Sequence, residues 1–248
     1  MTPHLHPVPG RVVTARATRE GTGGPSADAA RLYTAADLTT AAAIVDGMGH
    51  ASATVALAPV LAEVAVRVGA ARGTLAGLLT AALLVADRGP DGTGPDAVAV
   101  LAAAVPGQDT VVAWVGDCRA YGWDGRRLEG YTTDHTVGQQ LRANGVPVDL
   151  ARDHDNWIRV TLERATPATV FTAVIPAHEL VLLTSDGVHD QVEPDIVEAL
   201  VREHQHSPQD LVDALVAAAA PGDGGYRDDA TAVVLHIAAS SGASGVTV

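Results

Sequence analysis

Residues 41–50 read AAAIVDGMGH, an apolar run that passes directly into Asp46 and a glycine-rich turn. The run predicts a buried strand, yet this strand ends on a carboxylate. One interpretation is a hairpin in which Asp-Gly supplies the turn. The other is a metal ligand at a rigid strand end, beside a backbone carbonyl that glycine leaves free to turn toward the ion. The stretch alone is compatible with both interpretations, so the rest of the chain has to decide between them.

The composition indicates one globular domain. The chain has 248 residues, of which 47% are hydrophobic and only 3% aromatic, so the core is built from Ala, Val and Leu. All 16 basic residues are arginine, and the net charge is -13. This charge argues against a nucleic-acid partner, which needs a basic surface. An acidic surface fits a protein that gathers carboxylates around cations, and it fits simple solubility equally well.

The cysteine content and the apolar segments predict a soluble cytoplasmic protein with no membrane partner. Cys118 is the single cysteine, so no intrachain disulfide can form and a reducing compartment is expected. The first ten residues, MTPHLHPVPG, lack the basic and apolar regions of a signal peptide. The longest uncharged apolar run, residues 73–86, is shorter than the roughly 20 residues that cross a bilayer.

Strands and helices are expected in blocks, which predicts an α+β fold with a mainly antiparallel sheet arrangement. We expect a single domain over residues 10–238, with flexible tails at 1–9 and 239–248. Asp124-Gly125 is a two-residue hairpin signal. The expected strands are 11–20, 39–47, 97–105, 110–117, 119–125, 126–134, 156–163, 169–175, 179–187 and 230–237. The expected helices are 54–69, 74–86, 137–143, 194–204 and 208–219.

Four aspartates lie at strand ends with glycine beside or near them: Asp46, Asp117, Asp186 and Asp228. Each one alone is compatible with ordinary turn chemistry. Carboxylates that converge from strand ends repel one another unless cations neutralise them. Oxygen ligands on a rigid scaffold suit Mg²⁺ or Mn²⁺, and neither the cysteine nor the histidines have zinc-site spacing.

Five motifs follow in order: VDGMG (45–49), VGDCRAYGWDG (115–125), YTTDHT (131–136), LLTSDGVHDQV (182–192) and RDDATAVVL (227–235). In wording and order they resemble the signature motifs of the protein phosphatase 2C family, the metal-dependent Ser/Thr phosphatases, in its bacterial form. The resemblance covers roughly residues 11–237. It implies a β-sandwich of two mainly antiparallel sheets flanked by helices, and hydrolysis of phosphoserine or phosphothreonine by a metal-activated water.

The resemblance also implies roles for particular residues. Asp46 would bridge two Mn²⁺ or Mg²⁺ ions, and Gly47 would offer its carbonyl to one of them. Asp186 and Asp228 would complete this binuclear site, while Asp117 with Asp186 would hold a third, weaker ion. Residues 142–162 take the place of the family's flap, which influences substrate choice.

The sequence departs from the family pattern where Asn-Glu-Asp is usual. Ser26, Ala27 and Asp28 stand there, so the glutamate that holds metal-bound water is missing. Loss of such a group typically costs 10–100-fold in affinity or activity. The arginine that grips the substrate phosphate is also displaced. Arg19 is the nearest candidate and Arg16 the next, and a surface arginine on a strand is the competing interpretation.

Other departures affect residues beside the motifs. Asp229 replaces a neutral asparagine, which would tighten cation binding or simply face solvent. Met48 stands where eukaryotic relatives carry a histidine proposed as a general acid. His50 is expected to be an exposed loop residue, and His135 to order its own loop. Cys118 is expected to be a small buried residue and not a nucleophile.

The favoured hypothesis is a phosphoprotein phosphatase, expected to be a monomer, with a phosphorylated protein substrate and an opposing Ser/Thr kinase. The main alternative is a catalytically weak or inactive regulatory binding module that keeps the fold. Ala27 and the displaced arginine favour this alternative, whereas the four aspartates and Gly47 favour the enzyme. A third hypothesis is a hydrolase of a small phosphorylated metabolite.

Overall fold

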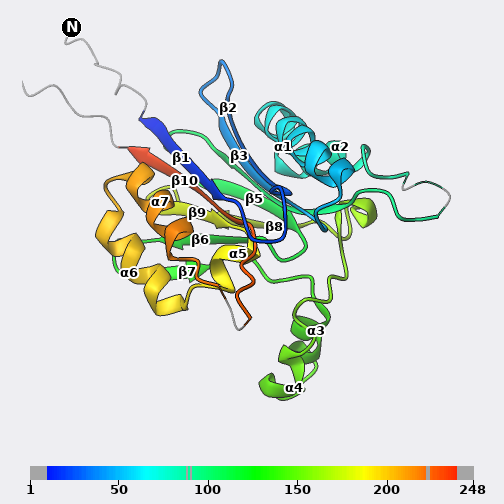
Figure 1. Cartoon of the computed structure of the whole chain (residues 1–248). Coiled ribbons are helices and arrows are strands. Elements are labelled where there is room, and N and C mark those ends of the chain that lie inside the picture. Colours follow the sequence, from blue (N-terminus) through cyan, green and yellow to red (C-terminus); the bar gives the residue numbers. More distant parts are fainter. Residues whose placement is uncertain (1–9, 88, 90, 222–223, 239–248) are drawn as a thin grey trace, which may run out of the picture.

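The computed structural model describes residues 10–87, 89, 91–221 and 224–238, which form two five-stranded antiparallel sheets with helices on the outer faces (Figure 1). The expected tails lie outside these residues. One sheet has the strand order β1-β10-β9-β6-β7 and the other β2-β3-β4-β5-β8. The strands are β1 (Arg11–Arg19), β2 (Asp28–Thr34), β3 (Thr40–Gly47), β4 (Ala97–Ala104), β5 (Thr110–Val115), β6 (Arg119–Trp123), β7 (Leu128–Gly130), β8 (Phe171–Ile175), β9 (Leu180–Thr184) and β10 (Ala230–Ala238).

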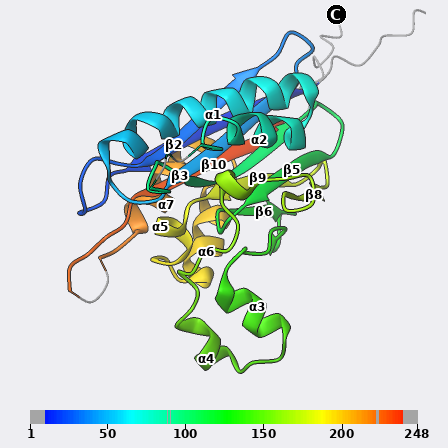
Figure 2. The same cartoon turned by 90° about the vertical axis from the view of Figure 1, so that its right-hand side faces the viewer.

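Two helices cover each sheet. Helices α1 and α2 pack on the sheet that contains β3, while α6 and α7 cover the other sheet. Helices α3 and α4 project from the body (Figures 1 and 2). The helices are α1 (Ser52–Arg72), α2 (Thr74–Ala82), α3 (Val137–Ala143), α4 (Val148–Arg152), α5 (Asp186–His189), α6 (Pro194–His204) and α7 (Pro208–Ala218), with a 3₁₀ turn η1 (Leu162–Arg164).

Strand β3 is apolar throughout because both of its faces are buried. Ala41, Ala43 and Val45 pack in the cluster under α1 and α2, whereas Ala42 and Ile44 pack between the two sheets. Burying one branched side chain such as Ile44 stabilises the fold by about 1.5–3 kcal/mol. The dry core that the sequence predicts for this strand is confirmed.

Helix α1 has the length and composition of a helix that could cross a membrane. Its buried side chains, among them Leu61, Ala65 and Val66, instead pack against the sheet in the core cluster. The apolar character of α1 therefore has an explanation within the fold itself.

Several sequence predictions of local structure are wrong. No strand forms over residues 156–163, where Ile158 makes one isolated bridge to Thr136 and η1 follows. The β6–β7 hairpin has a four-residue loop, because the Asp124 carboxylate accepts hydrogen bonds from the backbone N–H groups of Arg126 and Arg127. Strand β2 and helices α4 and α5 were not expected. Helix α1 runs on to Arg72, so only Gly73 separates it from α2.

Candidate active site

The antiparallel register brings the ends of separate strands to one edge of the sandwich. In one sheet, Gly47 at the end of β3 pairs with Ala97 at the start of β4, whose Ala99 pairs with Val115 at the end of β5. In the other sheet, Thr184 at the end of β9 pairs with Ala232 near the start of β10. The four expected aspartates lie at these strand ends: Asp46 is the next-to-last residue of β3, and the other three lie two residues beyond β5, beyond β9 and before β10.

A cavity of about 500 Å³ brings the expected metal ligands together. Asp46, Gly47, Asp117, Asp186 and Asp228 all line it, although they come from four separate segments of the chain. The other lining residues are Met48, Gly49, His50, Val98, Ile158, Tyr226 and Asp229. No arginine is among the lining residues, so the cavity is strongly acidic.

Burial and repulsion between carboxylates make three of these groups, Asp46, Asp117 and Asp186, hard to ionise. Burial, followed by the charge of Asp186, raises the pKa of Asp46 well above its usual value. Burial, followed by the charge of Asp117, does the same to the pKa of Asp186. Burial, with the nearby Asp134, raises the pKa of Asp117 to about 7. Among the described residues, the positive charge of Arg119 opposes this rise at Asp117 only in part.

The donor set fits hard divalent cations. Carboxylate oxygens with one backbone carbonyl are the ligands that Mg²⁺ and Mn²⁺ prefer, and a cation would relieve the repulsion that raises the pKa values. Among the described residues, no three acidic, imidazole or thiol groups already stand as a finished coordination sphere. The fit therefore rests on the chemistry and convergence of the donors.

Two glycines are required where the chain enters the site. A Cβ atom at Gly116, whose φ is 88°, would lie 2.1 Å from a methyl group of Val98. A Cβ atom at Gly47 would lie 2.6 Å from a Thr54 methyl group and 2.9 Å from the Ala27 carbonyl oxygen. Any side chain at either position would push an aspartate-bearing turn out of place.

Asp28 belongs to the acidic cluster but was not singled out as a site residue from the sequence. It pairs with Asp46 across β2 and β3, and its carboxylate accepts a hydrogen bond from Ser185 Oγ at 2.8 Å. Burial raises the pKa of Asp28 to about 7, the hydrogen bonds from Thr231 and Ser185 oppose that rise, and the nearby aspartates add to it. Its position as the first residue of β2, a strand that was not expected, hid this role, although the motif match at Asp28 was a usable signal.

Asp229 does not face solvent, which was one of the two roles expected for it. Its side chain is buried, and its two carboxylate oxygens accept hydrogen bonds from the backbone N–H groups of Gly21 at 2.7 Å and Ala27 at 2.8 Å. The residue therefore fastens the loop between β1 and β2 to the start of β10. Charge-assisted bonds of this kind are stronger than neutral ones, which suits a loop that contains three glycines.

The structure does not bring Arg19 to the cavity. Its guanidinium donates hydrogen bonds to the carbonyl oxygens of Val216, Ala217 and Ala219, at 3.4, 3.0 and 3.0 Å. Arg19 thus satisfies free carbonyl groups at the C-terminal end of α7, where a cation also complements the helix dipole. The expected phosphate contact is corrected accordingly, and Arg16 also lies outside the cavity lining.

The remaining motif residues are placed as follows. His50 lines the cavity, with Nδ1 3.3 Å from the Pro25 carbonyl oxygen and 3.9 Å from an Asp229 oxygen. His135 is buried and accepts a hydrogen bond on Nδ1 from the Gly116 N–H, so it does order its own loop. Met48 lies exposed in the cavity lining, and Cys118 is a fully buried free cysteine.

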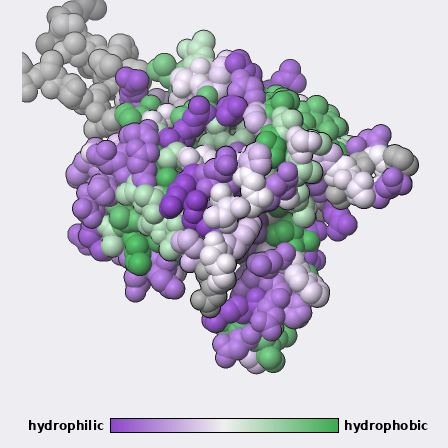
Figure 3. Space-filling model, viewed as in Figure 1, coloured by the Kyte–Doolittle hydropathy of each residue, from purple (hydrophilic) through white to green (hydrophobic). Residues whose placement is uncertain are grey.

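The flap segment lies beside the acidic cavity. It begins in the last two residues of α3 and carries α4, and the projection that α3 and α4 form is mainly hydrophilic in the space-filling view (Figure 3). Arg142 and Asp155 hold it together through two hydrogen bonds of 2.6 and 2.5 Å. Ile158 at its end lines the cavity of the aspartates. Through Ile158 the flap forms part of the wall of the acidic cavity.

No protein-family model and no curated protein matches the chain in sequence. Solved structures do match it in fold. The Ser/Thr phosphatase Stp1 from Staphylococcus aureus has a TM-score of 0.72 at 17% identity, covering 96% of this chain and 99% of that chain. The PPM Ser-Thr phosphatase MsPP from Mycobacterium smegmatis has a TM-score of 0.72 at 23% identity, covering 91% and 98%.

The catalytic domain of the serine/threonine protein phosphatase PstP, solved with two manganese ions, has a TM-score of 0.64 at 22% identity and covers 92% and 99%. Each comparison spans nearly the whole of both chains, so the likeness concerns the complete sandwich. The expected fold is confirmed: this chain has the fold of the protein phosphatase 2C, or PPM, Ser/Thr phosphatases.

Proposed function

We propose that this protein is a metal-dependent phosphatase that removes phosphate from phosphoserine or phosphothreonine in proteins. The observation that carries the proposal is the convergence of Asp46, Asp117, Asp186 and Asp228 with Gly47 in one acidic cavity. These five residues occupy four of the motifs that resemble the family. The manganese ions named with PstP support Mn²⁺ or Mg²⁺ as the cofactor.

In this proposal Asp46, the Gly47 carbonyl, Asp186 and Asp228 would hold a pair of ions. Asp117 with Asp186 would hold a third ion. A bound metal pair supplies a water acidic enough to attack phosphorus and positive charge for the phosphoryl oxygens. The Tyr226 hydroxyl donates a hydrogen bond to Asp228 Oδ1 at 3.2 Å and so helps to orient that carboxylate.

The protein residues need not include a nucleophile or an arginine in this chemistry. Their tasks are to hold the ions, to orient the ligand oxygens and to admit a phosphorylated side chain beside the flap. The substrate is then a phosphoprotein made by an opposing Ser/Thr kinase, and the protein acts in the cytoplasm as a monomer.

A catalytically weak or inactive regulatory module remains the second candidate. Ala27 is 2% exposed and stands where the family has a glutamate, and the cavity lining contains no arginine. Both features remove groups that would bind a water or the substrate phosphate. On general grounds the loss of one group that supports a metal site costs about 10–100-fold and does not abolish turnover.

The test is hydrolysis of an aryl phosphate and of a phosphothreonine peptide by the purified protein, with Mn²⁺ and with chelator. We expect chelator-sensitive turnover that Asp186→Asn nearly abolishes, because asparagine keeps the shape but loses the ligand charge. Asp213→Asn, an exposed change on α7, is the matched control and should retain activity. Absence of chelator-sensitive turnover on both substrates in a folded protein would favour the regulatory module.

A further inference from the structure

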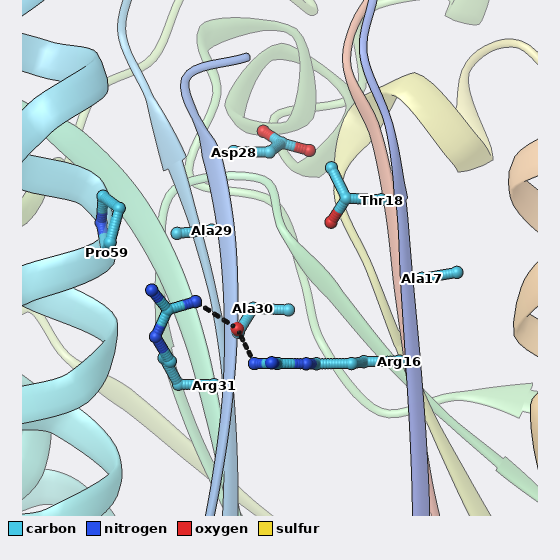
Figure 4. A pocket seen from close by; sticks show the side chains of 8 residues that line it. All are labelled: Arg16, Ala17, Thr18, Asp28, Ala29, Ala30, Arg31 and Pro59. Atoms are coloured by element: carbon cyan, nitrogen blue, oxygen red, sulfur yellow. Dashed lines mark hydrogen bonds between the residues drawn. The ribbon is translucent and has the colours of Figure 1, made fainter.

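A second cavity lies on the side of the sandwich, away from the lining of the acidic cavity. It has a volume of about 310 Å³ and runs between α1 and the edge strands β1 and β2 (Figure 4). We call it the edge groove. Its lining consists of Arg16, Ala17, Thr18, Asp28, Ala29, Ala30, Arg31 and Pro59.

Two arginines from different sheets converge in the edge groove. Arg16 on β1 donates a hydrogen bond to the Ala30 carbonyl oxygen at 2.5 Å, and Arg31 on β2 donates to the same oxygen at 2.9 Å. Figure 4 shows the two side chains approaching this oxygen from opposite sides. Since both nitrogens contact one atom, they lie within about 5 Å of each other, where like charges repel strongly.

Few carboxylates balance these two charges. Arg16 makes no ion pair within the described part of the chain, and the one found there for Arg31 is to Glu63 at a long 3.9 Å. The other oxygen of Glu63 pairs with Arg67 at 2.5 Å, so Glu63 is shared. A neutral carbonyl group is therefore the main partner of two guanidinium groups.

The groove also contains a hydroxyl group. The Thr18 hydroxyl lies 3.0 Å from the Thr231 hydroxyl, with which it shares a hydrogen bond. Asp28 closes the end of the groove toward the acidic cluster and would repel a negative ligand from that end. The charges within the groove thus favour an anion near the arginines and disfavour one near Asp28.

We propose that the edge groove binds an oxyanion, a phosphate or a carboxylate, between Arg16 and Arg31. Guanidinium groups keep several N–H donors in a planar fork after one is used, and this fork matches phosphate and carboxylate oxygens. Arg31 follows Asp28 by three residues along an extended strand, about 10 Å. The anion is therefore separate from a phosphoryl group held by the aspartates.

Two sources could supply this anion: free inorganic phosphate, or an acidic side chain of a protein substrate. The second source rests on the proposed phosphatase function, and the first does not. A purely structural role would be the capping of an exposed carbonyl on the edge strand β2. If that role is the whole explanation, replacing Arg16 and Arg31 lowers the stability of the fold without any effect on anion binding.

The first experiment uses the full chain in chelator, where the metal-free acidic cavity repels anions. Inorganic phosphate is titrated by calorimetry and by melting temperature, against chloride at equal ionic strength. We expect millimolar binding and a rise in melting temperature that chloride does not reproduce. The variant R16Q/R31Q should bind at least five-fold more weakly, whereas R72Q/R126Q, a double change of exposed arginines elsewhere with equal loss of charge, should bind as wild type.

Equal phosphate responses in wild type and R16Q/R31Q would overturn the proposal, and so would equal responses to phosphate and chloride. If R16Q/R31Q does not fold, R16K/R31K keeps the charges but loses the planar forks and should bind several-fold more weakly. Unchanged phosphate binding by folded R16K/R31K overturns the fork geometry proposed here. None of these outcomes depends on phosphatase activity, so failure of the proposed function would be seen separately.

The second experiment distinguishes the sources. With Mn²⁺, two phosphothreonine peptides are compared, one with flanking glutamates and one with glutamines in their place. If a substrate carboxylate is the source, KM for the acidic peptide is several-fold lower, and R16Q/R31Q removes that preference while aryl phosphate turnover is unchanged. Equal KM values, together with phosphate binding in the first experiment, assign the site to free phosphate.

Discussion

The acidic cluster makes a specific prediction about Asp117 in the metal-free protein. Its ordinary pKa of 3.8 rises to about 7 in the fold, mainly through burial and then through Asp134. The folded state therefore holds a proton that the unfolded chain releases between these two values. Stability from this group is present below pH 3.8 and is lost as the pH rises toward 7.

The size of the effect follows from the same pKa change. At 1.36 kcal/mol for each pH unit, the difference between 3.8 and about 7 corresponds to a ceiling of about 4 kcal/mol. Neighbouring carboxyl groups share protons with Asp117, so we expect about half of this ceiling, about 2 kcal/mol. Asp117→Asn has no titrating group there and should escape the loss.

The measurement is urea unfolding in chelator at pH 4.5, 6 and 8. Asp117→Asn should match wild type within about 1 kcal/mol at pH 4.5 and exceed it by about 2 kcal/mol at pH 8. The exposed Asp213→Asn is the control and should follow wild type at every pH. If the unfolding free energies of wild type and Asp117→Asn change in parallel with pH, the reasoning is refuted, because Asp117 would then have the same pKa in the folded and unfolded states.

Three further predictions follow from the site and its supports. Mn²⁺ at one hundred times its Kd should stabilise the wild type by about 2.7 kcal/mol and so raise its melting temperature, and Asp46→Asn should remove most of this response. If both proteins melt identically with and without Mn²⁺, the result contradicts a binuclear site. Arg19→Ala should lower the unfolding free energy by about 1–3 kcal/mol, because the α7 carbonyl groups lose a charged donor, and it should leave KM unchanged. A raised KM without loss of stability would instead support Arg19 as a residue that binds the substrate phosphate. Gly116→Ala should destabilise the protein by at least about 1 kcal/mol and weaken Mn²⁺ binding, because its Cβ would clash with Val98 and the positive φ disfavours alanine. Unfolding and calorimetry measure the two effects, and wild-type values for both would show that the turn relaxes at no cost.

The sequence by itself indicated the sandwich and the four aspartates that converge in the acidic cavity. Long apolar runs that end on Asp46, Asp117 and Asp186 are local features, and a buried strand followed by a carboxylate can be recognised without knowing its partners. Helix α6 was predicted with the bounds that it has, because proline marks its start and its apolar residues recur at helical spacing. Motif order then indicated the family fold.

Only the tertiary structure decided which polar groups meet. The β2–β3 register places Asp28 opposite Asp46, and β2 is a short edge strand whose weak periodicity hid it in the sequence. Arg19 lies two residues before Gly21 in the chain, but its guanidinium contacts the end of α7 about two hundred positions away. Such pairings depend on strand order and on the packing of distant segments, so no local pattern around these residues could reveal them.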